Sequence, residues 1–545
     1  MNTFRSSFIC CFLFLISNCF KLDTSHNFII DSHGRYKLFH GVNVVVKIPP
    51  YIPNTNTFDP YFSFTDKDIQ ILKNLGMNLV RLGIIWESIE KEEGKYDYEH
   101  LDKMAEIVNK LEKEGIAVII DAHQDIFSRN FCGEGVPTFY AEKLTVDTKC
   151  NKTFLSKLFK LLTACIPLDK YKWNRDENGL PLLTDCKLKG SFMDYHRSPE
   201  LYSIYDSFFK NEHGVLDKFI KFWEILAQKF SNKSNVLGYD IWNEPWAPGL
   251  WSDISNLIPG YVDDNYLSPF YTKVDKSISK LHKDYILFYQ SIPFPDTLPL
   301  FGGRILSSFS KPPVNIQQRP QVFNVHSYCC MAGPNVCRTE SGEPKLSDAK
   351  GFCKDFHNRK IRDNKKQAQQ LSAPLIITEF GACGGSEACY NEMLGLELAA
   401  DKYLVSWTYW MYKPFGDPTT TAANNTEGIF EADGSIQVYK EKALSRSYVL
   451  SYQGIPMNLE FNDETKEMKT SFRYFKNITA PNEIYLNKKL NYPNGYEVFV
   501  KNEFGDVIVA KIWEDEINSN YVYVDISKVE DGKIVSIVIE QKKNL

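Results

Sequence analysis

The feature that most constrains the fold is the regular alternation of short apolar runs with amphipathic segments over most of the chain. In Leu216–Phe230 apolar side chains recur at the spacing of one buried helix face. Eight other runs have the length and composition of strands: Lys37–Val44, Leu79–Ile85, Ala117–Asp121, Val236–Trp242, Tyr285–Tyr289, Gln321–His326, Leu375–Glu379 and Leu404–Trp410. Because alternating strands and helices form parallel sheets through right-handed βαβ units, this pattern predicts an α/β fold, a (β/α)8 TIM barrel. An open doubly wound sheet is the alternative.

The pattern changes after about Ser445. Helical periodicity gives way to short alternating runs such as Thr470–Phe475 and Tyr521–Ile526, which are separated by turn residues. This change predicts a small antiparallel β-sandwich domain over 446–545, following the barrel domain over 21–445.

The first twenty residues have the composition of a signal peptide. Arg5 precedes the apolar run Phe8–Ile16, and small residues follow it. The run is too short to cross a bilayer comfortably, so cleavage is favoured over the alternative of a signal anchor. We therefore expect a secreted protein, in the extracellular space or in a digestive or lysosomal lumen.

The cysteine content fits a secretory route. Three of the thirteen cysteines lie in the expected leader, and the even number that remains predicts several disulfides, for which we expect the pairs Cys383–Cys389 and Cys165–Cys186. No two cysteines have CxxC spacing, and we expect neither a metal nor a cofactor. The net charge of -5, without a long basic run, argues against a nucleic-acid partner. Sequons for N-glycosylation begin at Asn151, Asn232, Asn424 and Asn477.

Two glutamates lie where a barrel places its chemistry. Side chains at the carboxyl ends of barrel strands meet at one face, and Glu244 and Glu379 lie at the ends of the fourth and seventh runs. Retaining glycoside hydrolysis needs two carboxyl groups about 5–5.5 Å apart, one protonated and one ionised. The pair predicts a retaining glycosidase. We expect a hydrogen bond from Tyr328 to keep Glu379 ionised.

Four short motifs, in family order, resemble glycoside hydrolase family 5. They are Leu79-Val80-Arg81-Leu82, Asn243-Glu244-Pro245, His326-x-Tyr328 and Thr378-Glu379-Phe380-Gly381. The resemblance implies a β-glycosidase with Glu244 as acid/base and Glu379 as nucleophile. It further implies that Asn243 contacts the sugar 2-hydroxyl and that Arg81 lies beneath the nucleophile and orients it. It also implies that His123 and His326 line the subsite before the cleavage point.

A closer resemblance is to the endoglycoceramidases. It rests on the segment from His40 to Tyr51, on His123-Gln124-Asp125 and on Trp407-Thr408-Tyr409-Trp410-Met411-Tyr412. The resemblance implies hydrolysis of the bond between the oligosaccharide and the ceramide of glycosphingolipids, with the first sugar bound by Lys47, Asp125 and Trp410. The alternatives are another family 5 β-glycosidase, such as a β-glucanase or a steryl-glucosidase, and a non-catalytic glycolipid-binding protein.

The segment after Glu244 is unusually apolar for a surface loop. Its large apolar side chains are Trp246, Leu250, Trp251, Ile254, Leu257 and Ile258. Since the leaving group departs on the side of the acid/base, we expect this loop to form a groove for a lipid aglycone, with transient contact at a membrane or micelle surface. A covering for the barrel top is the alternative interpretation.

Overall fold

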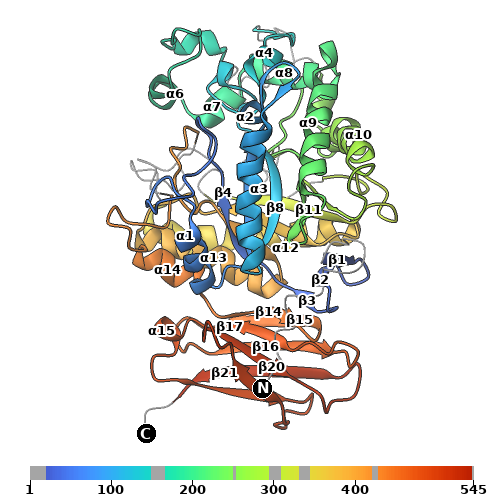
Figure 1. The fold of residues 1–545 in the computed structure, drawn as a ribbon, viewed down its shortest axis with the longest axis vertical. Coiled ribbons are helices and arrows are strands. Elements are labelled where there is room, and N and C mark those ends of the chain that lie inside the picture. The colour runs from blue at the N-terminus through green and yellow to red at the C-terminus, as the bar shows by residue number, and fades with distance from the viewer. Residues whose placement is uncertain are drawn as a thin grey trace.

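The computed structural model describes residues 20–148, 166–249, 253–293, 308–329, 344–419 and 427–542. These residues form a large α/β part and a smaller all-β part, stacked end to end (Figure 1). The predicted leader lies outside the described residues, except for Phe20. So do Cys165, Leu250 and Trp251.

The α/β part is a closed barrel of eight parallel strands, which confirms the predicted TIM-barrel fold. Each of the eight apolar runs overlaps one barrel strand, and β8, β11 and β12 continue one or two residues beyond their runs. The strands are β4 (His40–Val44), β5 (Leu79–Ile85), β8 (Ala117–His123), β9 (Val236–Asp240), β10 (Ile286–Tyr289), β11 (Gln321–Ser327), β12 (Leu375–Phe380) and β13 (Ser406–Tyr409). Around the barrel they follow the order β10-β11-β12-β13-β4-β5-β8-β9.

Amphipathic helices surround the barrel (Figure 1). In α9 (Val215–Phe230) the side chains of Leu216, Phe219 and Trp223 are buried, as the apolar spacing predicts. The other long helices are α1 (Asp66–Asn74), α3 (Tyr98–Lys113), α8 (Pro199–Phe209), α10 (Ser268–Ile278), α12 (Lys354–Gln370) and α13 (Glu387–Tyr403). Short elements in the connecting segments are α2 (Trp86–Ile89), α4 (Thr138–Ala141), α6 (Leu183–Lys189), α7 (Phe192–His196), α11 (Leu346–Asp348), α14 (Val438–Leu444) and the hairpin of β6 (Glu90–Glu92) and β7 (Lys95–Tyr96).

Three disulfides lie within the described residues. They are Cys132–Cys186, Cys329–Cys353 and Cys383–Cys389. The last pair confirms the prediction. The predicted pair Cys165–Cys186 is wrong, because α6 brings Cys186 against Cys132, which lies 54 residues away in the sequence. The spacing of the cysteines in the sequence does not predict this contact. The contact depends on how the inserted helices pack against the barrel.

The C-terminal part consists of two antiparallel sheets, as predicted. One sheet has the order β15-β16-β21-β18 and the other ends in β14-β17-β20-β19. The strands are β14 (Tyr448–Tyr452), β15 (Gly454–Phe461), β16 (Met468–Tyr474), β17 (Asn482–Tyr485), β18 (Tyr496–Lys501), β19 (Lys511–Glu514), β20 (Tyr521–Asp525) and β21 (Ile534–Gln541), with the short helix α15 (Lys488–Asn491).

Three N-terminal strands belong to the second sheet of this domain. They are β1 (Phe20–Asp23), β2 (Phe28–Asp31) and β3 (Tyr36–Lys37), and β3 pairs with β14. Phe28 and Tyr36 accordingly pack into the core of the β-sandwich. The sequence pattern groups this segment with the barrel, whereas in the structure it extends the sheet of the C-terminal domain.

The β-sandwich closes the amino end of the barrel. His40, at the start of β4, stacks between Trp407 of β13 and Tyr448 of β14, with ring centroids 4.2 and 3.6 Å away. The carboxyl ends of the barrel strands, where the candidate site residues lie, are therefore at the opposite end of the barrel. No helix among the described residues is both long and apolar enough to cross a membrane.

Candidate active site

The two candidate glutamates extend from opposite sides of the barrel mouth. Glu379 lies in β12, and Glu244 follows β9, with β10 and β11 between these strands in the barrel order. The carboxyl-terminal end of β11 contributes His326, and the middle of β5 contributes Arg81. The structure thus brings into one site residues that are scattered over some three hundred positions of the sequence.

Both carboxylate oxygens of Glu379 accept hydrogen bonds. Arg81 donates from Nη1 to Oε1 over 2.7 Å, and the hydroxyl of Tyr328 donates to Oε2 over 2.9 Å. Glu379 is itself buried. The hydrogen bond expected from Tyr328 is present, and a guanidinium lies against the carboxylate, an environment that suits a charged nucleophile.

Arg81 is fully buried and holds several site residues at once. Its Nη2 donates to Oδ1 of Asn243 over 2.9 Å and forms an ion pair with Asp121 at 2.9 Å. Its Nε donates to Asp240 over 2.9 Å. Burial alone would lower the pKa of this guanidinium. The attraction of the Asp121 and Asp240 carboxylates outweighs burial, so the pKa is raised above its usual value. Arg81 therefore orients the nucleophile and Asn243 from below.

Glu244 lies in a different electrostatic environment. Burial, and then the neighbouring Asp125 carboxylate, raise the pKa of Glu244 to about 7. Its backbone has a φ of 40°, in the left-handed region that residues other than glycine seldom adopt. Strain of this kind is frequent at functional sites. A carboxyl group with this pKa is half protonated at pH 7 and increasingly protonated below it, as a general acid requires.

His326 lies between the two glutamates. Its Nδ1 is 2.7 Å from Oε1 of Glu244 and 3.3 Å from Oε2 of Glu379. This nitrogen and one carboxylate oxygen of each glutamate lie within 4.8 Å of one another. Burial lowers the pKa of His326 to about 3, so the imidazole is neutral and carries a single ring proton. The two carboxyl groups thus have the proximity that the retaining mechanism requires.

Gln290 is a site residue that the sequence did not indicate. It follows β10, and its Nε2 donates to Nε2 of His326 over 3.0 Å. Its Oε1 accepts a hydrogen bond from the backbone N–H of Glu244 over 3.0 Å. The amide thereby fixes both the backbone of the candidate acid and the orientation of the imidazole.

A second cluster adjoins the glutamates on the side of β4, β8 and β13. Lys47 forms an ion pair with Asp125, and its Nζ lies 4.5 Å from the ring centre of Trp410. Asn243 connects the two clusters, because its Nδ2 lies 3.3 Å from Oδ1 of Asp125. The three residues predicted to bind the first sugar are therefore in contact. Two further polar groups reach Lys47: Asp417, at 3.2 Å, and Thr419, which accepts over 2.9 Å.

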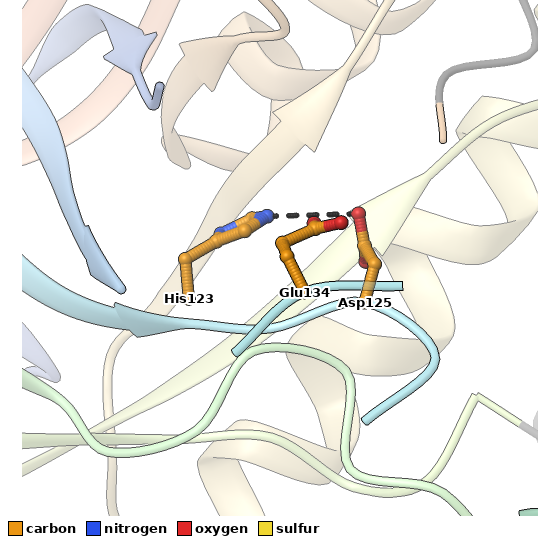
Figure 2. A group of neighbouring side chains, drawn as sticks. All are labelled: His123, Asp125 and Glu134. Carbon is orange, nitrogen blue, oxygen red and sulfur yellow. Dashed lines mark ion pairs between the residues drawn. The ribbon is translucent and has the colours of Figure 1, made fainter. Parts of the chain in front are cut away.

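His123 is positioned by its own acidic partner. Its Nδ1 lies 2.7 Å from Asp121, and its ring stacks on Trp410 with centroids 5.2 Å apart. Burial alone would lower the pKa of His123, but the Asp121 carboxylate raises it to about 9, so the imidazole is a buried cation. Figure 2 shows His123, Asp125 and a further buried residue, Glu134, with their side chains projecting in the same direction.

The apolar loop after Glu244 is only partly described. Leu250 and Trp251 lie outside the described residues, as do the side chains of Ile254 and Leu257. Ile258 is exposed. Trp246 is buried and stacks on His196 of α7, with centroids 4.3 Å apart. Trp246 thus packs beneath the inserted helices, which corrects its expected place in an exposed groove.

The chain matches known families over both of its parts. Residues 46–163 and 175–416 match the family described as Cellulase (glycosyl hydrolase family 5), and residues 446–539 match the glycoside hydrolase family 5 C-terminal domain. The chain belongs to glycoside hydrolase family 5. It is accordingly a glycoside hydrolase, as its two facing carboxyl groups predict.

Several relatives of the chain are endoglycoceramidases. The chain is 30% identical to the endoglycoceramidase of Cyanea nozakii over 87% of this chain and 85% of that protein. It is 28% identical to the endoglycoceramidase of Hydra vulgaris over 95% of this chain and 88% of that protein. Its fold resembles endo-glycoceramidase II from Rhodococcus sp. with a TM-score of 0.67 at 17% identity, covering 95% of this chain and 100% of that one.

Proposed function

We propose that this family 5 enzyme hydrolyses the bond between the oligosaccharide and the ceramide of glycosphingolipids, with Glu244 as acid/base and Glu379 as nucleophile. The observation that carries this proposal is the pair of carboxyl groups joined through His326, in which Glu244 has a pKa of about 7 and Glu379 accepts hydrogen bonds from Arg81 and Tyr328. Glu244 can therefore donate a proton to the leaving group, and a carboxylate oxygen of Glu379 can attack the anomeric carbon.

The reaction proceeds by double displacement. A carboxylate oxygen of Glu379 bonds to the anomeric carbon while the bond from this carbon to the ceramide oxygen breaks, and Glu244 gives its proton to that oxygen. Water then attacks the glycosyl-enzyme ester, Glu244 takes the water proton, and Glu379 leaves as a carboxylate. Asn243, fixed by Arg81, donates to the 2-hydroxyl, while Lys47, Asp125 and Trp410 hold the first sugar.

Two observations support a glycolipid substrate. The relatives in Cyanea nozakii and Hydra vulgaris are endoglycoceramidases, and the chain covers most of the length of each. The segment after the acid/base includes Leu250 and Trp251, and Ile258 beyond them is exposed. An enzyme that acts on a membrane lipid must also reach a membrane or micelle surface, and exposed apolar side chains suit that contact.

Two other features favour export. The described sequons at Asn232 and Asn477 are exposed, as glycan attachment requires. The three disulfides suit an oxidising compartment. We therefore propose that the leader is cleaved and that the enzyme acts outside the cytosol. Mass spectrometry of protein secreted from a eukaryotic host, before and after enzymatic deglycosylation, tests the cleavage and the glycans together.

The decisive experiment is incubation of the enzyme with a panel of substrates. The panel contains glycosphingolipids in detergent micelles, a steryl β-glucoside and a soluble β-glucan, with the E379Q variant as the control. We expect free oligosaccharide and ceramide from the glycosphingolipids, and no turnover by E379Q. Hydrolysis of the steryl glucoside or the glucan, with none of the glycosphingolipids, would assign the enzyme to another family 5 activity.

The aglycone loop supplies a second test. If Leu250 and Trp251 contact the lipid, L250S/W251S should lower activity on glycosylceramide at least about tenfold, since each buried CH₂ group contributes about 0.8 kcal/mol. Activity on a short aryl β-glycoside should change far less, because its leaving group does not reach the loop. An equal loss on both substrates would make the loop a structural covering.

A further inference from the structure

Glu134 approaches the sugar-binding cluster through a tightly constrained turn. Its backbone pairs with that of Asp125, with N–O distances of 3.1 and 2.9 Å. On either side, Gly133 and Gly135 lie so close to the chain that an added Cβ would meet Asp125 O at 1.9 Å and Gln124 Cβ at 2.3 Å. Cys132, which directly precedes Gly133, forms a disulfide with Cys186 of α6. The close glycine contacts and the disulfide indicate that the turn is built to hold the Glu134 side chain beside Asp125 (Figure 2).

The carboxyl group of Glu134 is buried without a donor. The side chain is fully inaccessible, and among the described residues neither of its oxygens receives a hydrogen bond. The nearest cation is Lys47, whose Nζ is 3.8 Å from Oε1. An ionised carboxylate left in this condition is costly, because burial removes its hydration and nothing replaces it.

The neighbouring Asp125 is supplied with donors. Its Oδ2 accepts hydrogen bonds from Nζ of Lys47 and, over 2.8 Å, from the hydroxyl of Thr419. Its Oδ1 accepts one from Nδ2 of Asn243 over 3.3 Å. Burial alone would raise the pKa of Asp125, but Lys47 and His123 hold it well below its usual range. Asp125 is therefore the ionised member of the pair, and two adjacent carboxyl groups are stable only when the other holds a proton.

The surrounding charges lead to the same assignment. Burial, and then the Asp125 carboxylate, raise the pKa of Glu134 well above its usual range, and Asp417 acts in the same direction. Lys47 opposes this effect, but its charge is already shared with Asp125 and Asp417. The half-buried phenol of Tyr51 and the buried phenol of Tyr205 also interact electrostatically with Glu134, and burial raises the pKa of both, so they remain neutral.

We propose that Glu134 is a positioning residue that remains protonated and donates a hydrogen bond to Asp125, holding Asp125 and Lys47 in place for the first sugar. This role deepens the proposed function and rests on it for the identity of the sugar site. The proton makes the side chain a donor, and a glutamine amide is a donor of nearly the same shape. A leucine of similar size offers no donor at all.

The test compares E134L and E134Q. On glycosylceramide micelles and on an aryl β-glycoside, E134L should lower kcat/KM by at least about tenfold, because the buried Asp125 loses a donor. E134Q should restore most of that loss. Glu397, a buried glutamate whose oxygens also receive no hydrogen bond among the described residues, lies in α13. E397L is therefore the matched control, and it should leave kcat/KM unchanged in protein that remains folded.

The pH profile separates a neutral Glu134 from a charged one. An ionised Glu134 would help to raise the pKa of Glu244, and E134Q would then move the alkaline limb of kcat/KM to lower pH. A protonated Glu134 contributes no such charge, so E134Q should leave the limb in place. Infrared difference spectra of parent and E134Q should show a protonated carboxyl band that only the parent has.

Three outcomes would overturn the proposal. They are an E134Q variant as impaired as E134L, a displaced alkaline limb, and a difference spectrum that shows an ionised carboxylate in place of the protonated band. These outcomes are independent of the lipid assignment. If the parent enzyme cleaves no glycolipid, the proposed substrate fails, while the aryl glycoside still reports on Glu134.

Discussion

Gln290 donates a hydrogen bond from Nε2 to Nε2 of His326 over 3.0 Å. Because burial lowers the pKa of His326 to about 3, the ring is neutral, and a nitrogen that accepts cannot also carry the proton. The proton is therefore on Nδ1, the atom that faces the carboxyl oxygens of Glu244 and Glu379. Gln290 thus determines that the ring proton of His326 is on Nδ1, from which it can be donated to the two glutamates.

The first prediction follows from this tautomer. Q290E replaces the donor by an acceptor, so the proton should move to Nε2 and Nδ1 should lose its ability to donate. We expect kcat to fall at least about tenfold, as for other residues that orient catalytic groups. Nitrogen-15 chemical shifts of His326 should report the change of tautomer. Unchanged shifts together with full activity would refute the assignment.

The second prediction concerns the catalytic pair. E379Q and E244Q should each lower turnover on glycosylceramide by several orders of magnitude, because one removes the nucleophile and the other the positioned proton. An aryl glycoside with a good leaving group needs little protonation, so it should partly rescue E244Q and leave E379Q inactive. Comparable rescue of both variants would show that the roles are not divided in this way.

The third prediction is stereochemical. The carboxyl groups of Glu244 and Glu379 are close enough for a covalent glycosyl-enzyme, so the β-anomer should be released first. An added alcohol should be trapped as the β-glycoside. Proton NMR of the earliest product checks this outcome, and an initial α-anomer would mean that a water molecule lies between the two carboxyl groups.

The fourth prediction concerns pH. Glu244 has a pKa of about 7 and must be protonated to act as an acid, so kcat/KM should fall as the pH rises above about 7. The slope should approach a tenfold loss per pH unit. With an activated aryl glycoside in E244Q this limb should disappear, because no carboxyl group remains to titrate. A limb that persists unchanged in E244Q would assign it to another group.

The fifth prediction concerns the disulfides. Reduction should lower the melting temperature, since one bridge typically contributes about 2–4 kcal/mol to the free energy of unfolding. The double variant C132S/C186S should also lower activity, because this bridge anchors the turn that carries Glu134. C383S/C389S is the matched control for loss of one bridge. Ready alkylation of all cysteines in the native protein would contradict an oxidised state.

The barrel was predictable because its signal is local. Each strand is a short apolar run at a spacing that suits a βα unit, and burial on both faces leaves that run without polar alternation. Glu244 and Glu379 could be located for the same reason, since each lies at the end of such a run within a short motif. The spacing of the apolar runs and the position of the glutamates at their ends were sufficient to predict the barrel and the catalytic pair. Neither prediction required knowledge of a long-range contact.

Other features depended on contacts that the sequence does not display. Gln290 is an uncharged residue after the fifth run, and its importance arises only from its distance to His326 and Glu244. Glu134 lies in a loop rather than at a strand end, although glycines on both sides are a sign of close packing. The partner of Cys186 depended in the same way on the folding of the inserted helices.

The pairing of β3 with β14 has a consequence for the order in which the protein assembles. Lys37 and Ser451 face each other in one sheet, although 414 positions separate them. During synthesis the first strands therefore emerge long before their partner, and the whole barrel must be made before the sheet can be completed. In a ribosome-bound chain that ends before Tyr448, β3 can pair only with β2, because β14 has not yet been made. Strand β14 thus completes a sheet that begins with β1, β2 and β3, and it joins early and late segments of the described chain by hydrogen bonds.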